Sequence, residues 1–132
     1  MNDIIRKFET KHFRVIVRAE EEYDLDLSFD DTGEITRGLE TGKYVAFCAH
    51  AFVVFKPTGT VLADDFLGNC IYESFESFMD HKECGQQNRE YAAQGINGRI
   101  GSYFTQMVAN VCAEARNQFK QMQDSICSIR LR

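Results

Sequence analysis

The sequence predicts an α+β fold, in which an antiparallel β-sheet of four or more strands packs against two or three C-terminal helices. Three observations lead to this prediction. Apolar and polar residues alternate through much of the first 72 residues, as they do in half-buried strands. After residue 73 the apolar residues recur at the spacing of a helix. The length of 132 residues fits a single domain, residues 1–132, that is large enough to bury a core.

Four segments have the pattern of strands. HFRVIVRAE, residues 12–20, and YDLDLSF, residues 23–29, each alternate apolar with charged side chains, so a pairing of the two places arginines opposite aspartates on a solvated face. Tyr44–Lys56 is apolar on both faces, which is typical of a central strand. The turn KPTGT joins it to Val61–Tyr72 in a long hairpin, and Gly68 in the return strand predicts either a bulge or a close approach of another backbone.

The remaining pattern is helical. A single turn is expected near residues 35–39, and Phe75 and Phe78 share one face of a short helix that Ser74 can cap. A long helix is expected from Ser102 to Asp124, because its apolar residues recur every three or four positions. The tail SICSIRLR is expected to be either frayed or a late strand.

Composition narrows the classes of function. The formal net charge of −5 argues against direct, non-specific binding of nucleic acid, which needs a cationic surface. No apolar run approaches the roughly 18 to 20 residues that cross a bilayer, and the first residues do not resemble a secretory signal. Five scattered cysteines without a CxxC pair indicate reduced thiols. We therefore expect a cytoplasmic protein that does not contact a membrane.

Cys48 and His50 are the most suggestive pair for metal or covalent chemistry, because alternate residues of a strand project from the same face. The further ligands of a zinc site would have to come from Cys70, His81 and Cys84. The spacing matches no finger or ribbon, so a hydrogen-bonded core histidine is favoured. A Cys–His nucleophile oriented by Asp64 or Asp65 would need an activated thiol, of which the sequence gives no sign. We expect no metal, no cofactor and no catalysis.

GINGRIGSYF, residues 95–104, is the strongest candidate for a ligand site. The first turn of a helix offers free backbone N–H groups that bind anions. Gly98 allows a ligand to approach the backbone, Ser102 can cap the helix, and Arg99 supplies a charged fork. The side chains that could add charge or stacking to this site are Arg89, Arg116 and Tyr103. The alternative is that the glycines only serve a turn between two helices.

Part of the chain resembles a known group of proteins. DDFLGNCIYESFESFMDHKEC, followed by NREYAAQGINGRIGSYFTQMVANVCAEAR, is similar to small phage and prophage proteins in which a sheet precedes two helices. In that family the second helix opens with GSYF, continues with MV and ends with EAR. The resemblance covers about residues 61–119. The phage-encoded anti-Thoeris sponges, which sequester a cyclic ADP-ribose signal, share this architecture.

The resemblance implies roles for individual residues. Phe78 would stack the base, Asn88 would orient the ligand and Arg116 would hold a phosphate. Alanines occupy two positions where further arginines are expected, so the other phosphate contacts would come from Arg99 and Arg89. Those alanines are Ala109 and Ala113.

Two hypotheses of function follow. The first is a phage counter-defence protein in the host bacterial cytoplasm that sequesters a cyclic ADP-ribose-like or cyclic oligonucleotide signal between subunits of a homo-oligomer, without catalysis. The alternative is an anti-CRISPR-type inhibitor that contacts a bacterial defence protein through an acidic surface. That surface would comprise residues 19–30, which include six acidic residues, together with Asp64 and Asp65.

Overall fold

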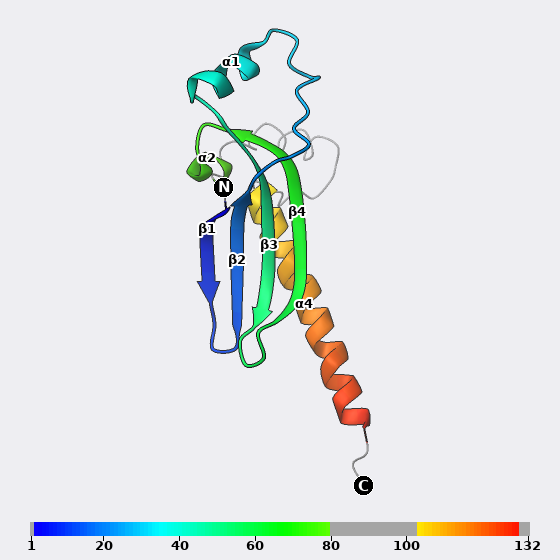
Figure 1. Cartoon of the computed structure of the whole chain (residues 1–132). Helices are drawn as coiled ribbons and strands as arrows, with labels where there is room; N and C mark the ends of the chain where they lie inside the picture. The colour runs from blue at the N-terminus through cyan, green and yellow to red at the C-terminus, as the bar shows by residue number, and fades with distance from the viewer. Residues whose placement is uncertain (1, 80–102, 130–132) are drawn as a thin grey trace, which may run out of the picture.

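The computed structural model describes residues 2–79 and 103–129, and these residues form an antiparallel sheet with helices (Figure 1). The strands are β1 (Asn2–Glu9), β2 (Phe13–Glu20), β3 (Val45–Phe55) and β4 (Thr60–Tyr72). The helices are α1 (Glu34–Thr41), α2 (Phe75–Met79) and α4 (Tyr103–Ser128). The predicted α+β class is confirmed.

The strands lie in the sheet in chain order, β1-β2-β3-β4, and every neighbouring pair is antiparallel. β3 is an inner strand, as its apolar pattern predicts, and the predicted hairpin with β4 is confirmed. The bulge predicted at Gly68 is confirmed too, because the register shifts where Phe47 pairs with Cys70 and Ala49 pairs with Leu67. Two residues of β4 therefore stand opposite one residue of β3.

α4 covers one face of β3 and β4 (Figure 1). Every second residue of β3 faces this helix, and the small side chains of Ala49 and Ala51 are fully buried there. From α4, Met107, Val111 and Ala115 complete the contact, so the helix packs through residues three to four positions apart. The rest of the buried core comes from Val17, Ala19, Phe47, Val53, Leu62, Ala63, Cys70 and Phe78.

Aromatic side chains pack against one another where α2 contacts the sheet. The Phe47 ring lies edge-on to Phe75 at 5.2 Å and to Phe78 at 5.3 Å, centroid to centroid. Phe78 also contacts the rings of Tyr72 and Phe104. These separations fall in the range of favourable aromatic pairs. The predicted cap of α2 is confirmed, because the hydroxyl of residue 74 accepts a hydrogen bond from the backbone N–H of residue 77.

The prediction of a strand at residues 23–29 is wrong. Nearby side chains take up backbone N–H groups that a ladder would use: Asp26 accepts from the N–H of Ser28, and Glu22 accepts from that of Asp24. The neighbour of β2 is instead β1, which the sequence did not predict. β1 is an exposed edge strand whose register shifts between Ile4 and Arg6. Its sequence, NDIIRKFE, does not alternate apolar with polar residues, so it lacks the pattern by which a strand is predicted.

α4 also continues further than predicted, to Ser128 rather than to Asp124, and includes the start of the apolar tail. Phe119 is the last residue of α4 that is not exposed, and its ring lies 5.3 Å from that of Phe13 and 5.4 Å from that of Phe55. Beyond this point the helix runs past the end of the sheet (Figure 1). The contacts of α4 therefore divide it into a packed part, up to Phe119, and an exposed part.

We expect Phe47→Ala to destabilise the fold by about 3 to 5 kcal/mol, because it removes a fully buried ring with aromatic contacts to two elements. Urea unfolding followed by circular dichroism would measure the free energy of unfolding. The matched control is Phe66→Ala, since the Phe66 side chain is 55% exposed. Equal losses in the two variants would contradict this view of the core.

Candidate functional site

The structure does not bring the described candidates for ligand binding together. Phe78 is 1% exposed, so both faces of its ring are covered by the core. Tyr103 borders a hollow with Ile35 and the end of β4. Arg116 is exposed 13 positions further along α4, about 20 Å away at 1.5 Å per residue. The other candidates, Asn88, Arg89, Gly98, Arg99 and Ser102, lie outside the described residues.

Arg116 borders a groove between α4 and strands β2 and β3. Its volume is about 540 Å³, within the range of small-molecule sites. Rings of Phe13 and Phe119 line it, and Lys120 lies one helical turn from Arg116 on the same flank. The sequence analysis missed Lys120, although the spacing of four residues between two cations on a helix was a signal that could have found it.

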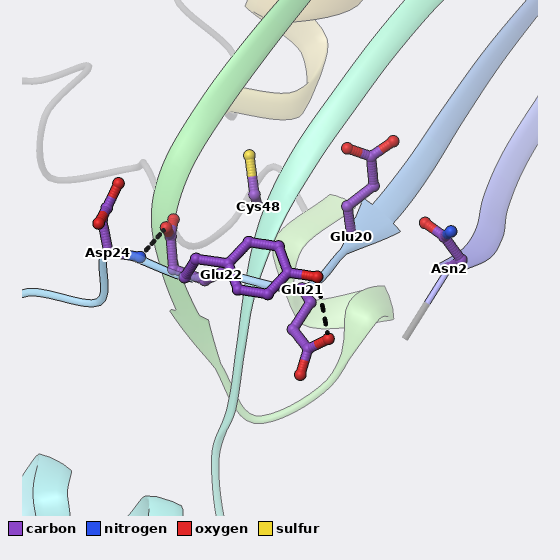
Figure 2. A pocket seen from close by; sticks show the side chains of 7 residues that line it. Asn2, Glu20, Glu21, Glu22, Asp24 and Cys48 are labelled. Carbon is purple, nitrogen blue, oxygen red and sulfur yellow. Dashed lines mark hydrogen bonds between the residues drawn. The ribbon is translucent and has the colours of Figure 1, made fainter.

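At the opposite end of β2, acidic side chains surround a second hollow, of about 500 Å³ (Figure 2). β2 ends at Glu20, and the chain then leaves the sheet, so the alternation of side-chain directions ends as well. The carboxylates that line the hollow belong to Glu20, Glu21, Glu22 and Asp24. Tyr23 is 85% exposed beside them, and its hydroxyl donates to the Glu21 carboxylate at 3.4 Å.

The acidic segment is anchored to β4. The Glu22 carboxylate accepts hydrogen bonds from the backbone N–H of Asn69 at 2.6 Å and from that of Asp24 at 3.0 Å. The Asn69 side-chain oxygen in turn accepts from the N–H of Asp26 at 3.0 Å. The bulge of β4 therefore holds the segment in place, and Asn69 adopts a positive φ of 55° there.

Two other carboxylates of the acidic segment have a structural role. The hydrogen bond from the backbone of Ser28 lowers the pKa of Asp26, and that from the backbone of Thr36 lowers the pKa of Asp30. Asp30 also accepts from the N–H of Ile35, so it satisfies two donors in the first turns of α1. Four of the six acidic residues thus line the hollow, and three hold backbone N–H groups: Glu22, which does both, Asp26 and Asp30.

His50 is hydrogen-bonded, as predicted, but it lies on the sheet face opposite α4 and not in the buried core, where the prediction placed it. Its Nδ1 is 3.0 Å from a Glu20 oxygen and its Nε2 is 3.4 Å from an Asp64 oxygen, while its ring stacks on Phe66 at 3.9 Å. A doubly protonated imidazole donates to both carboxylates, whereas a neutral one has a single N–H to donate. Because both carboxylates contact the His50 ring, Asp64 lies on the same face of the sheet as Glu20. The register places Asp65 on the other face.

The surroundings of Cys48 and Cys70 do not activate their thiols as nucleophiles. Burial raises the pKa of the Cys70 thiol to about 12, and burial with the nearby Glu22 and Glu20 raises that of Cys48. The thiolate is the reactive form, so both thiols are deactivated at neutral pH. Within residues 2–79 and 103–129, no group of three or more histidine, cysteine or acidic side chains could hold a metal ion. His81 and Cys84 lie outside these ranges.

The fold and these sites define an α+β protein with an acidic end and a cationic groove on α4. A scan against protein-family models, a search of curated proteins and a search of solved structures each gave no match. None of the described helices has the length and apolar character needed to cross a membrane.

We expect iodoacetamide at pH 8 to modify the exposed Cys127 and to leave Cys70 almost unlabelled in the folded protein. With a pKa of about 12, only about one Cys70 thiol in ten thousand is ionised at that pH. Mass spectrometry of the labelled peptides measures both rates, and unfolding in urea should make them similar. Equal rates in the folded protein would show that the Cys70 thiol is accessible and ionised.

Proposed function

We propose that the protein is a non-enzymatic binding protein whose acidic end contacts a cationic site on a partner protein. The observation that supports this proposal is the hollow lined by four carboxylates at the end of β2. Neighbouring carboxylates repel one another, and a surface rich in arginine and lysine relieves that repulsion. The exposed ring of Tyr23 adds a side chain of the type that is enriched in interfaces.

The partner chemistry that fits is a groove that otherwise binds the phosphates of a nucleic acid. Carboxylates at the end of a strand present several negative charges at close spacing, as a phosphate backbone does. Asp64 extends the same charge onto the open face of the sheet, where it is 53% exposed, while Asp65 does not belong to this face. In the phage context that the resemblance implies, the partner is a CRISPR effector of the host cytoplasm.

The test is the binding of labelled target DNA to a purified CRISPR effector complex in the presence of this protein. We expect the wild type to displace the DNA and Glu21→Lys/Asp24→Lys to be about tenfold to a hundredfold less potent, because both partners are then cationic. The effect should weaken as salt screens the charges.

The matched control is Glu40→Lys/Glu114→Lys, which makes the same change of net charge at exposed sites outside the acidic hollow. Equal loss of potency in the two double variants would show that only net charge matters. Undisturbed DNA binding and interference in the presence of the wild type would exclude the proposal for that effector.

One observation favours a second function, the sequestration of a phosphorylated nucleotide signal. Arg116 and Lys120 flank a groove that contains the rings of Phe13 and Phe119. We propose that a base packs on the aromatic side of this groove and that the two cations hold the phosphates. This places the candidate site at the middle of α4, whereas the sequence analysis placed it at the start of the helix.

Calorimetric titration with cyclic ADP-ribose isomers and cyclic dinucleotides tests this second function. We expect Arg116→Ala and Lys120→Ala each to raise the dissociation constant about tenfold or more, since each removes a charged hydrogen-bond donor. Arg37→Ala, at an exposed arginine of α1, is the control, and Arg99→Ala compares the two placements of the site. An absence of binding heat with every ligand would overturn sequestration of these nucleotides.

A further inference from the structure

The face of the sheet opposite α4, which we call the open face, is not covered by any described helix (Figure 1). It nevertheless carries large apolar side chains. Ile4 is 57% exposed on the edge strand β1, and on the other edge strand, β4, Val61 is 54% and Phe66 55% exposed. Large apolar side chains that gather on one face are a feature of interaction surfaces.

The pairing of the strands arranges the open face in four rows that cross the sheet. Paired residues of neighbouring strands share a face, and so do alternate residues of one strand. Row one contains Asn2, Glu20 and Cys48, and row two contains Ile4, Arg18, His50 and Phe66. Row three contains Lys7, Ile16, Phe52 and Asp64, and row four contains Glu9, Arg14, Val54 and Val61. Rows one and four are about 20 Å apart, at about 3.4 Å per residue.

The two ends of the open face have opposite charge. The face itself is neutral, with three cations and three carboxylates: Lys7, Arg14, Arg18, Glu9, Glu20 and Asp64. Row one borders the hollow that four carboxylates line, so this end is acidic. Row four lies at the end of the sheet where Lys11 and Lys56 join Arg14, and Glu9 is the only carboxylate bonded there. That end is cationic.

We propose that two copies of this chain pack their open faces against each other, related by a two-fold axis that crosses the strands between rows two and three. Row one of each copy then lies opposite row four of the other, so an acidic end meets a cationic end at both ends of the contact. Glu20 faces Arg14 of the second copy, and the symmetry makes this pair twice. Aligned packing of two sheets is a common way to cover apolar sheet faces.

No charged side chain of the open face meets a like charge in this arrangement. The other charged groups lie opposite uncharged residues of the second copy, in the pairs Lys7–Ile4, Glu9–Asn2, Arg18–Ile16 and Asp64–Phe66. Each charged group also has an opposite partner in its own chain: Glu9 bonds Arg14 at 2.7 Å and Lys7 at 3.4 Å. Glu20 lies 3.5 Å from Arg18, and Asp64 lies 3.4 Å from His50. Charges that are paired in this way can be covered at less cost.

The orientation of the pair follows from the acidic ends. A two-fold axis along the strands would set the two acidic ends side by side, in a chain of net charge −5. Four strands about 4.8 Å apart and seven residues of about 3.4 Å give a face of roughly 19 Å by 24 Å, or about 900 Å² for the pair. Interfaces of this size are typical of weak complexes, so the dimer should form in a concentration-dependent way.

The dimer also bears on the acidic hollow, because row one borders it. A second copy covers part of the surface with which the protein is proposed to bind a cationic partner, so the two compete. The inference does not rest on the proposed function, since self-association is measured with this chain alone. A failure of either proposal therefore leaves the other standing.

Sedimentation equilibrium of the full chain, from about 1 μM to several hundred μM, tests the proposal. The apparent mass of the wild type should rise from one chain towards two. Phe66→Asp and Val61→Asp should each raise the dissociation constant about tenfold or more, because each puts an unpaired charge into the contact. The matched control is Phe29→Asp. That ring is also 55% exposed but lies away from the open face, in a hollow that Tyr103 of α4 borders, so this variant should associate as the wild type does.

The variant Glu21→Lys/Asp24→Lys distinguishes the two orientations. It should weaken the proposed dimer, because lysines then face the cationic end of the second copy, whereas it would strengthen a dimer with adjacent acidic ends. A wild type that stays monomeric throughout the series overturns the proposal. So does a dimer that Phe66→Asp and Val61→Asp leave unchanged, or one that the double lysine variant strengthens. Circular dichroism checks that the variants are folded, which we expect because the substituted side chains are exposed.

Discussion

The contact between α4 and the inner strand β3 is the interaction on which the rest of the structure depends. β3 carries apolar side chains on both faces, and its alanines allow α4 to lie against the sheet. The residues buried by this contact hold β4 and α2 in place as well, since Phe47 touches rings from both. The acidic end, the groove and the exposed end of α4 are all positioned relative to this one packed layer.

The two faces of the sheet differ in chemistry because only one of them is covered by α4. The covered face uses alanine, valine and phenylalanine, whereas the open face combines rings with charged groups. Arg18 lies 4.9 Å from the ring centroid of Phe52, and His50 is bonded to carboxylates of two neighbouring strands. Hydrogen bonds and ring contacts across strands thus stabilise a face that the described helices do not shield from water.

Much of the fold could be predicted from the sequence because its elements have strong periodicity. The β3–β4 hairpin, the cap of α2 and most of α4 follow from local patterns. Residues 23–29 alternate just as regularly, yet they form no strand, because Glu22 and Asp26 bind backbone N–H groups of this segment instead. Alternation alone does not reveal which hydrogen bonds the side chains will make.

The sites were harder to predict than the fold, because they depend on contacts between residues that are far apart in the chain. The groove at Arg116 forms where Phe13, far away in the chain, packs against Phe119. The acidic run was visible in the sequence, but the bond that anchors it to β4 joins Glu22 to Asn69, 47 positions away. The glycine-rich stretch that drew most attention falls largely outside the described residues.

The link between Glu22 and Asn69 has a consequence for how the acidic end forms during folding. The two residues are 47 positions apart, so the segment cannot reach its final shape before the hairpin has closed and the bulge is in register. Local opening of edge strand β4 would release the same segment. The acidic end therefore belongs to the cooperative unit of the sheet. Its carboxylates take up their folded arrangement only when β4 is correctly paired with β3.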